Sequence, residues 1–114
     1  MIIVVFRTHV KPGADLEELQ TLFKQMLALV SEMPGFLSIK DFSAQDGESL
    51  ALVEFDSLAS VDAWKEHPEH LLAQRRGRDE FFTDYRIQVC HLIRTSEFTA
   101  DVKTRQSDNA TPAH

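Results

Sequence analysis

The feature that most constrains the fold is a long apolar stripe that follows the first strand-like segment. Between Leu16 and Met33, apolar residues recur every three or four positions, the repeat of an amphipathic helix. Asp15 stands just before the stripe and Glu18 follows three residues later, so this pair predicts the helix start. A Pro-Gly dipeptide predicts its end. A helix with one apolar stripe must cover another layer, and the flanking segments supply a sheet.

Four segments have the apolar character of β-strands, and they span residues 2–10, 36–43, 50–56 and 85–94. An Asp-Gly turn joins the second and third as a hairpin. A second helical segment starts at Ser57 or Ser60 and breaks at His67-Pro68, with residues 79–84 as a connector before the last strand. The order predicts an α+β fold, the ferredoxin-like split βαβ sandwich (β-α-β-β-α-β). We expect its first and last strands to lie at different places in the sheet.

Composition limits the class of protein. The 114 residues predict one domain, which we place at 1–95, followed by a polar tail at 96–114 that is flexible or draped on a partner. A net charge of −6 argues against nucleic-acid binding, and no apolar run is long enough to cross a membrane. Cys90 is the single cysteine, so the chain forms no internal disulfide and a cytoplasmic location is the simplest prediction.

Both helices of this topology lie on one face of the sheet, which leaves the other face uncovered. Several strands place apolar residues on that face, and a domain of this size does not usually leave such a patch in water. We therefore expect a homodimer in which two open sheet faces pack together. Polar members of the face, such as Arg7, His9 and Arg86, are then expected at the rim or around a cavity.

The stretch from Ser60 to Arg78 carries the strongest candidates for a small-molecule site. Trp64 is the only tryptophan, and either it packs in the core or it walls a pocket. His70 is either a base in that pocket or a structural hydrogen-bonding residue, and His67 is interpreted as a capping or surface residue. Two histidines without a third ligand do not make a metal site, so we predict none.

Four further polar side chains lie on the first and last predicted strands. Arg7 and His9 share one face of the first strand, and Tyr85 and His91 share one face of the last. These residues are candidates for substrate binding inside a cavity. A buried Arg or His has to be paired, and an acidic, phenolic or enolic substrate is a natural counter-group for Arg7.

With these features in view, the chain resembles the antibiotic biosynthesis monooxygenase family of dimeric α+β barrels over roughly residues 1 to 95. The resemblance rests on short motifs at the ends of the predicted elements and on the central helical stretch. These are Lys11-Pro-Gly13, Met33-Pro-Gly-Phe36, Glu54-Phe-Asp-Ser57, Trp64 with His67-Pro-Glu-His70, Gly77-Arg78 and Phe81-Phe-Thr-Asp-Tyr85.

The resemblance implies a cofactor-independent monooxygenase that oxidises a small aromatic or quinol-like substrate with O2. Such enzymes use the electron-rich carbanion of the substrate itself, so the protein need only bind, deprotonate and exclude water. His70 and Trp64 are then the expected catalytic residues, with no cofactor. Substrate binding is assigned to four residues of the first and last predicted strands: Arg7, His9, Tyr85 and His91.

Two alternatives stay open. A non-catalytic dimeric domain of the same fold would hold a small ligand, or none, without turnover. A haem-binding or haem-degrading protein is a further alternative, but relatives of that kind use an Asn where this chain has Phe6. Their axial His corresponds to Gln74, and His70 falls about one turn away from it.

Overall fold

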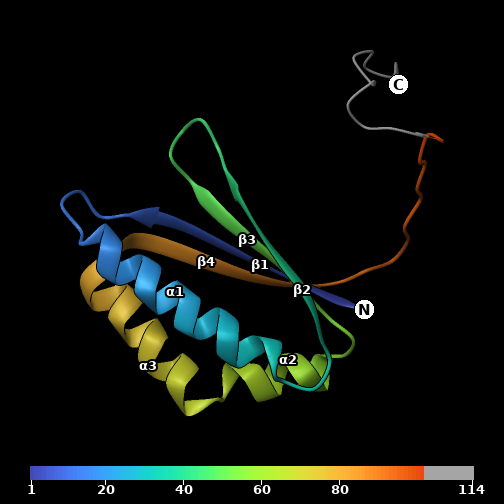
Figure 1. Ribbon diagram of the computed structural model, residues 1–114, viewed down its shortest axis with the longest axis horizontal. Coiled ribbons are helices and arrows are strands. Elements are labelled where there is room, and N and C mark those ends of the chain that lie inside the picture. Colours follow the sequence, from blue (N-terminus) through green and yellow to red (C-terminus); the bar gives the residue numbers. More distant parts are fainter. Residues whose placement is uncertain (102–114) are drawn as a thin grey trace.

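The computed structural model describes residues 1–101, and the elements follow the predicted order. They are β1 (Ile2–Val10), α1 (Leu16–Ser31), β2 (Phe36–Ser43), β3 (Ser49–Phe55), α2 (Leu58–Lys65), α3 (Pro68–Arg76), the π-helix η1 (Gly77–Phe81) and β4 (Phe82–His91). Residues 92–101 form no helix or strand and run away from the folded body (Figure 1). The predicted tail at 96–114 falls mostly on residues 102–114, which lie outside the described part of the chain.

The four strands form one antiparallel sheet in the order β2-β3-β1-β4 (Figure 1). This order and the three helices confirm the ferredoxin-like prediction. The first and last strands are immediate neighbours, with Thr8 opposite Tyr85 and Ile2 opposite His91. Our expectation that they lie at different places in the sheet is therefore wrong: the first crossover leads to β2 at the edge, the hairpin brings β3 beside β1, and the second crossover brings β4 to the other side of β1.

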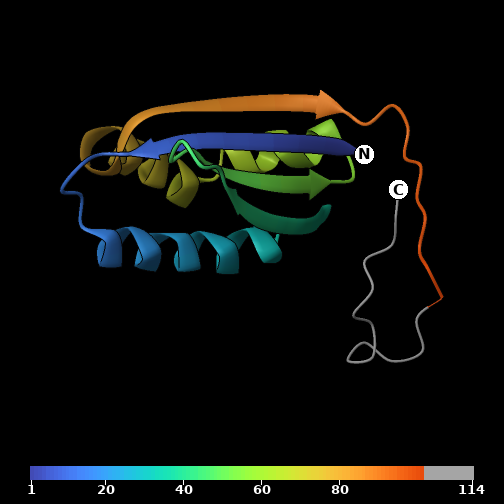
Figure 2. The same ribbon diagram turned by 90° about the horizontal axis from the view of Figure 1, so that it is seen from above.

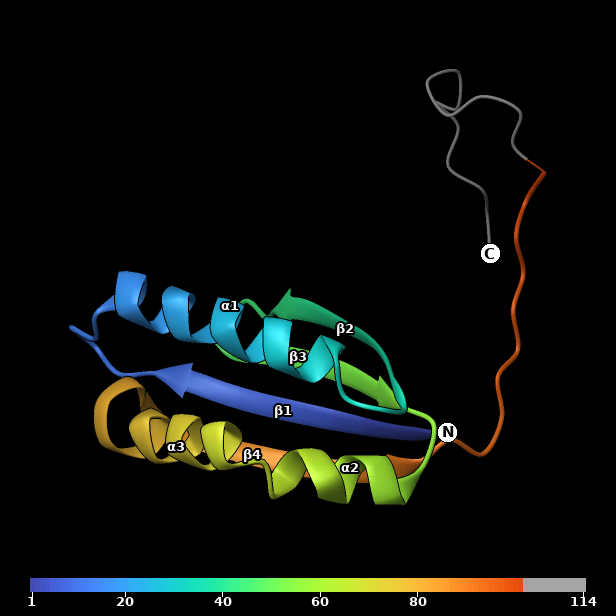
Figure 3. The ribbon, with the colours of Figure 1, turned by 60° about the horizontal axis from the view of Figure 1, so that its bottom comes forward.

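All three helices cover the same face of the sheet (Figures 2 and 3). Seen from the helix side, α1 lies over β2 and β3, whereas α2 and α3 lie over β4, with β1 running between them (Figure 3). The predicted cap of α1 is confirmed, since the Asp15 side chain accepts a hydrogen bond from the Glu18 backbone N–H at 3.1 Å. Among residues 1–101, no helix has the length and apolar character needed to cross a bilayer.

Two apolar clusters join the helices to the sheet, one near each end of β1. The first packs α1 and α2 against β1 and β3 through Ile2, Val30, Phe55 and Val61. The second packs α1 against the end of β4 through Leu19, Phe81 and Phe82. Phe55 and Phe81 are each only 1% exposed. A recess opens beside the second cluster, with Phe6 contributing to both.

The break between α2 and α3 is the one predicted at Pro68. Ser57 caps α2 by accepting from the Ser60 backbone N–H, and His67 caps α3 by accepting from the Glu69 backbone N–H at 3.1 Å. Pro68 occupies the first turn of α3, where a missing N–H costs nothing. The prediction of His67 as a capping residue is confirmed.

The end of the helical layer differs from the prediction. The chain passes from α3 into η1 without a connector, and β4 starts at Phe82 rather than at Tyr85. Gly77 makes this possible, because a Cβ at that position would lie 2.9 Å from the Phe82 ring. The Phe81-Phe82 pair thus enters the core as the sheet begins, instead of lying in a loop.

Candidate functional site

A recess opens between α1 and the sheet, near the end of β1 that leads into α1. Its volume is about 150 Å3, which is the size of an apolar cavity that holds benzene in another protein. We call it the α1 recess. It is lined by Phe6, Thr8, Phe23, Asp41, Phe42, Ser43, Ser49, Leu50 and Ala51.

Register decides which of these side chains point into the recess. Residues that face each other across antiparallel strands share a face of the sheet. Thr8 lies opposite Ser49, which lies opposite Ser43, so these three form one row on the helix-covered face. Phe6, Ala51 and Asp41 form the next row. Phe42 and Leu50 alternate with these positions, so their side chains turn away and their backbone lines the recess.

Trp64 and His70 form a stacked pair at the junction of α2 and α3. The ring centroids are 4.2 Å apart and the planes differ by 13°. His70 Nδ1 lies 3.0 Å from the backbone oxygen of Trp64. A carbonyl oxygen only accepts, so Nδ1 carries the proton and Nε2 of the neutral ring keeps a free lone pair.

The pair sits partly inside the protein, and this changes how His70 titrates. Burial lowers the pKa of His70; the bond to the Trp64 carbonyl opposes that shift, and the nearby His67 adds to it. The ring is therefore neutral at pH 7, the form a general base requires. Trp64 also packs against the core cluster of Ile2, Val30, Phe55 and Val61, so its core role is observed.

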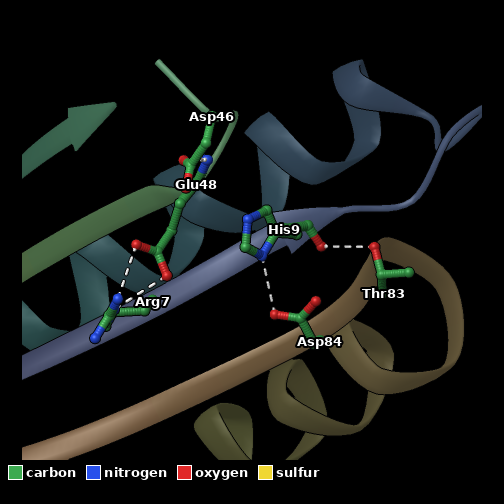
Figure 4. Close-up of polar contacts among 6 residues, drawn as sticks. All are labelled: Arg7, His9, Asp46, Glu48, Thr83 and Asp84. Atoms are coloured by element: carbon green, nitrogen blue, oxygen red, sulfur yellow. Dashed lines mark hydrogen bonds and ion pairs between the residues drawn. The ribbon is translucent and has the colours of Figure 1, made fainter. Parts of the chain in front are cut away.

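Arg7 and His9 point to the opposite, helix-free face of the sheet, and each is already paired (Figure 4). Arg7 donates to both carboxylate oxygens of Glu48, at 3.0 and 3.1 Å. His9 Nδ1 lies 3.0 Å from an Asp84 carboxylate oxygen. The bond to Glu48 raises the pKa of Arg7, and the bond to Asp84 raises the pKa of His9. These pairs form a charged corner beside the β2–β3 turn.

Tyr85 and His91 lie on β4, on the same face as the helices. The Tyr85 ring packs beside Phe6, with centroids 5.9 Å apart, and its hydroxyl accepts from Arg78 of η1 at 3.0 Å. Tyr85 therefore reaches the α1 recess only through Phe6. His91 lies opposite Ile2 at the other end of β1, and it is exposed.

The six residues predicted from sequence are thus distributed over three places. Trp64 and His70 are in contact, Arg7 and His9 share the helix-free face, and Tyr85 and His91 lie on β4. None of these six residues lines the α1 recess, which is bordered by β1, β2, β3 and α1. Among residues 1–101, no group of three or more His, Cys, Asp or Glu side chains is placed to hold a metal ion.

The recess itself was missed in the sequence, although one signal for it was present. Thr8 stands among Ile2, Val4, Phe6 and Val10 on the core face of β1, and it is 3% exposed. A hydroxyl at such a position marks either a local bond or an opening. Ser43, Ser49 and Asp41 give no local signal, because only the pairing of three strands places them beside Thr8.

Comparison with known proteins establishes the family of this chain. The profile of the antibiotic biosynthesis monooxygenase family matches residues 1–76, well over half of the chain. The chain belongs to this family. YqjZ of Bacillus subtilis (strain 168), which is uncharacterised, is 28% identical over 75 residues. That match covers 66% of this chain and 66% of YqjZ, so the chain spans slightly less than two thirds of its relative's length.

Solved structures agree on the fold of this antibiotic biosynthesis monooxygenase family member. Rv0793 from Mycobacterium tuberculosis has a TM-score of 0.73 at 18% identity, and the match covers 84% of this chain and 98% of that chain. SnoaB, a cofactor-independent oxygenase from Streptomyces nogalater, has a TM-score of 0.69 at 14% identity, over 82% and 94% of the two chains. At these identities the likeness establishes the fold alone.

Proposed function

We propose that this protein is a cofactor-independent monooxygenase that oxidises a small aromatic or quinol-like molecule with O2. Family membership supports the reaction class, and a structural relative, SnoaB, is a cofactor-independent oxygenase. The single observation that carries the proposal is the state of His70. Its Nδ1 is committed to the Trp64 carbonyl, its pKa is lowered, and Nε2 is free to take a proton.

The proposed reaction begins when His70 Nε2 removes the proton of a phenolic hydroxyl. The resulting phenolate is electron-rich at a ring carbon, and that carbon forms a bond to O2, which is reduced to a peroxide anion. The imidazolium returns its proton to the peroxide. Loss of water across the C–H and O–O bonds then leaves a quinone. One oxygen atom enters the product and the other leaves as water, so the substrate supplies every electron.

Trp64 is assigned the role of a wall beside His70. The stacked indole fixes the plane of the imidazole and shields it from water, which keeps the ring neutral. Tyr85 is assigned to substrate binding through its contact with Phe6. Arg7 and His9 lie on the helix-free face, and we assign them to a cavity completed by a second copy of the chain. His91 lies on the helix side and is not part of that cavity.

Oxygen uptake by the full-length protein, measured across a panel of hydroxylated one- to three-ring aromatics, tests this function. We expect uptake with at least one member and one 18O atom in the product from 18O2. His70→Gln should lower kcat by about 100-fold or more, the usual contribution of a general base. The matched control is His67→Asn, which keeps a good helix cap and should retain activity. A silent wild type, or a fully active His70→Gln variant, would overturn the proposal.

We also propose that the working form is a homodimer joined through the helix-free face. This face carries Phe42, which is 46% exposed, beside half-buried apolar residues of the two central strands. Those residues are Ile3, Val5, Leu50 and Leu52.

Cys90 is an exposed free thiol, which supports a reducing compartment such as the cytoplasm.

A ligand-binding domain without turnover is the second candidate, favoured by one observation. The α1 recess is a ring-sized space beside the sheet, and His70 is not among the residues that line it. Tight binding of a ring compound, with no oxygen uptake by the wild type, would favour this candidate over the enzyme.

A further inference from the structure

The floor of the α1 recess is polar, and it runs from the buried Thr8 on β1 to Ser43 and Asp41, which are exposed on the edge strand β2. Three hydroxyl side chains, Thr8, Ser49 and Ser43, cross β1, β3 and β2 in one row. Asp41 stands in the adjacent row beside Ala51. At the other end of β1 the same face carries Ile2 and Phe55, which are 2% and 1% exposed. The helix-covered face therefore changes from buried apolar residues at one end of β1 to hydroxyl residues at the other end, where the recess opens.

These polar side chains are able to form hydrogen bonds with a ligand. No side-chain hydrogen bond found within residues 1–101 uses the hydroxyls of Thr8, Ser43 or Ser49, or the carboxylate of Asp41. Every fully buried side-chain polar atom in this part of the chain has a partner, so the Thr8 hydroxyl is not sealed in the core. A hydroxyl both donates and accepts, whereas an ionised carboxylate only accepts.

The apolar part of the recess is aromatic on two sides. Phe6 rises from the floor, and its ring is held edge-on by Phe82 at 5.9 Å. Phe23 of α1 lines the recess from the helix side and is 47% exposed. Aromatic rings prefer to pack against other rings in tilted or offset arrangements. A volume of about 150 Å3 has room for one ring.

The charge of the lining limits the ligand further. Asp41 is the one ionisable side chain that lines the recess; no Lys, Arg or His does so. The Arg7 guanidinium is on the opposite face and is already held by both oxygens of Glu48. A carboxylate or sulfonate on the ligand would therefore meet a like charge, with no cation to compensate.

We propose that the α1 recess selects a neutral, single-ring molecule with at least two hydroxyl groups, and that Asp41 determines this specificity. One ligand hydroxyl donates to the Asp41 carboxylate, and a second exchanges hydrogen bonds with the row formed by Thr8, Ser49 and Ser43. The ring lies between Phe6 and Phe23. This inference concerns binding alone and does not take the ligand to be the substrate of His70, because His70 does not line the α1 recess.

Isothermal titration of the full-length protein under argon tests it, because binding is then separated from oxidation. The probes are hydroquinone and catechol, compared with phenol and with 3,4-dihydroxybenzoate. We expect the dihydroxybenzenes to bind at least about tenfold more tightly than either comparison ligand, the usual size of a hydrogen bond to a charged group. Asp41→Asn should weaken dihydroxybenzene binding and strengthen dihydroxybenzoate binding. Thr8→Val should weaken dihydroxybenzene binding without a gain for the carboxylate.

Asp62→Asn is the matched control, since it removes an exposed carboxylate on α2 outside the recess. It should leave all four affinities unchanged. Equal binding of the neutral and carboxylate rings, no binding of any probe, or equal effects of Asp41→Asn and Asp62→Asn would overturn the inference. Selective binding without oxygen uptake would leave it standing while the proposed function fails. Oxygen uptake by the wild type, together with the same ligand selectivity in Asp41→Asn as in the wild type, would support the proposed function and overturn the inference.

Discussion

His9 and His70 are both half-buried, yet their environments act on them in opposite directions. His9 lies on the helix-free face beside Asp84, and that hydrogen bond raises its pKa. His70 lies in the helical layer against Trp64, and burial lowers its pKa. The two environments differ in kind: a carboxylate favours the imidazolium of His9, whereas burial favours the neutral ring of His70 and outweighs the hydrogen bond to the Trp64 carbonyl.

The contrast extends to the two faces of the sheet. The helix-covered face carries the apolar core, the α1 recess and a neutral base. The helix-free face keeps two charged groups in pairs, Arg7 with Glu48 and His9 with Asp84, near the exposed Phe42 and half-buried apolar residues. Paired charges at the edge of an apolar patch tolerate contact with a second protein surface better than unpaired ones. The helix-covered face therefore holds the core, whereas the helix-free face is the one through which we propose that two copies associate.

The largest effect is expected from a matched pair of phenylalanines on the two faces. Phe55→Ala empties a core position that is 1% exposed, and it should lower the free energy of unfolding by about 3–5 kcal/mol. Phe42→Ala removes a ring that is 46% exposed, and in dilute monomer it should cost less than about 1 kcal/mol. Urea denaturation of both variants at the same concentration gives the comparison. Similar losses in monomeric protein would show that the helix-free face also carries a core.

The next effect concerns association alone. Leu52→Asp places a charge on the helix-free face and should weaken the proposed dimer by about 2–4 kcal/mol, or roughly 30- to 1000-fold in Kd. Analytical ultracentrifugation over a concentration series measures this change. Leu58→Asp is the control, because Leu58 is 47% exposed on α2, on the helix side. If both variants dimerise like the wild type, the interface lies elsewhere.

A smaller effect follows from the titration of the two histidines. Since the folded-state pKa of His70 is lowered, the unfolded chain binds a proton more readily, and the stability falls as the pH drops through about 6.5. His9 has a raised pKa, so its contribution is present below pH 6.5 and is lost as the pH rises through its folded value. Denaturation at pH 5.5 and 7.5 should therefore show less acid sensitivity in His70→Gln and more in His9→Asn. The same direction in both variants would contradict the contrast.

Sequence patterns predicted the elements because the signals are local. The stripe after Leu16, the Asp15 cap and the break at Pro68 depend on neighbours within one or two turns, and the structure has all three. The start of β4 was misplaced because Phe81 and Phe82 look like loop residues until Gly77 lets η1 pack against them. The close packing of Gly77 against Phe82 is a tertiary contact, and a short stretch of sequence does not reveal it.

The site was harder to predict for the same reason. Trp64 and His70 are six residues apart, so their contact could be anticipated from one helical stretch. The hydroxyl row joins Thr8 to residues more than thirty positions away, and it exists only through the register of β1, β3 and β2. A shift of one residue in any of these strands would turn its member to the other face.

The smallest predicted effect tests the cause of the difference between the histidines most directly. Asp84→Asn keeps the shape of the partner but removes its charge, so the pKa of His9 should fall towards its ordinary value while that of His70 stays lowered. Titration of the imidazole resonances by NMR follows both rings in one sample. A fall at His9 alone would assign its shift to the single contact with Asp84. A parallel change at His70 would mean that the charges of the helix-free face act through the sheet, and that the two faces are not electrostatically separate.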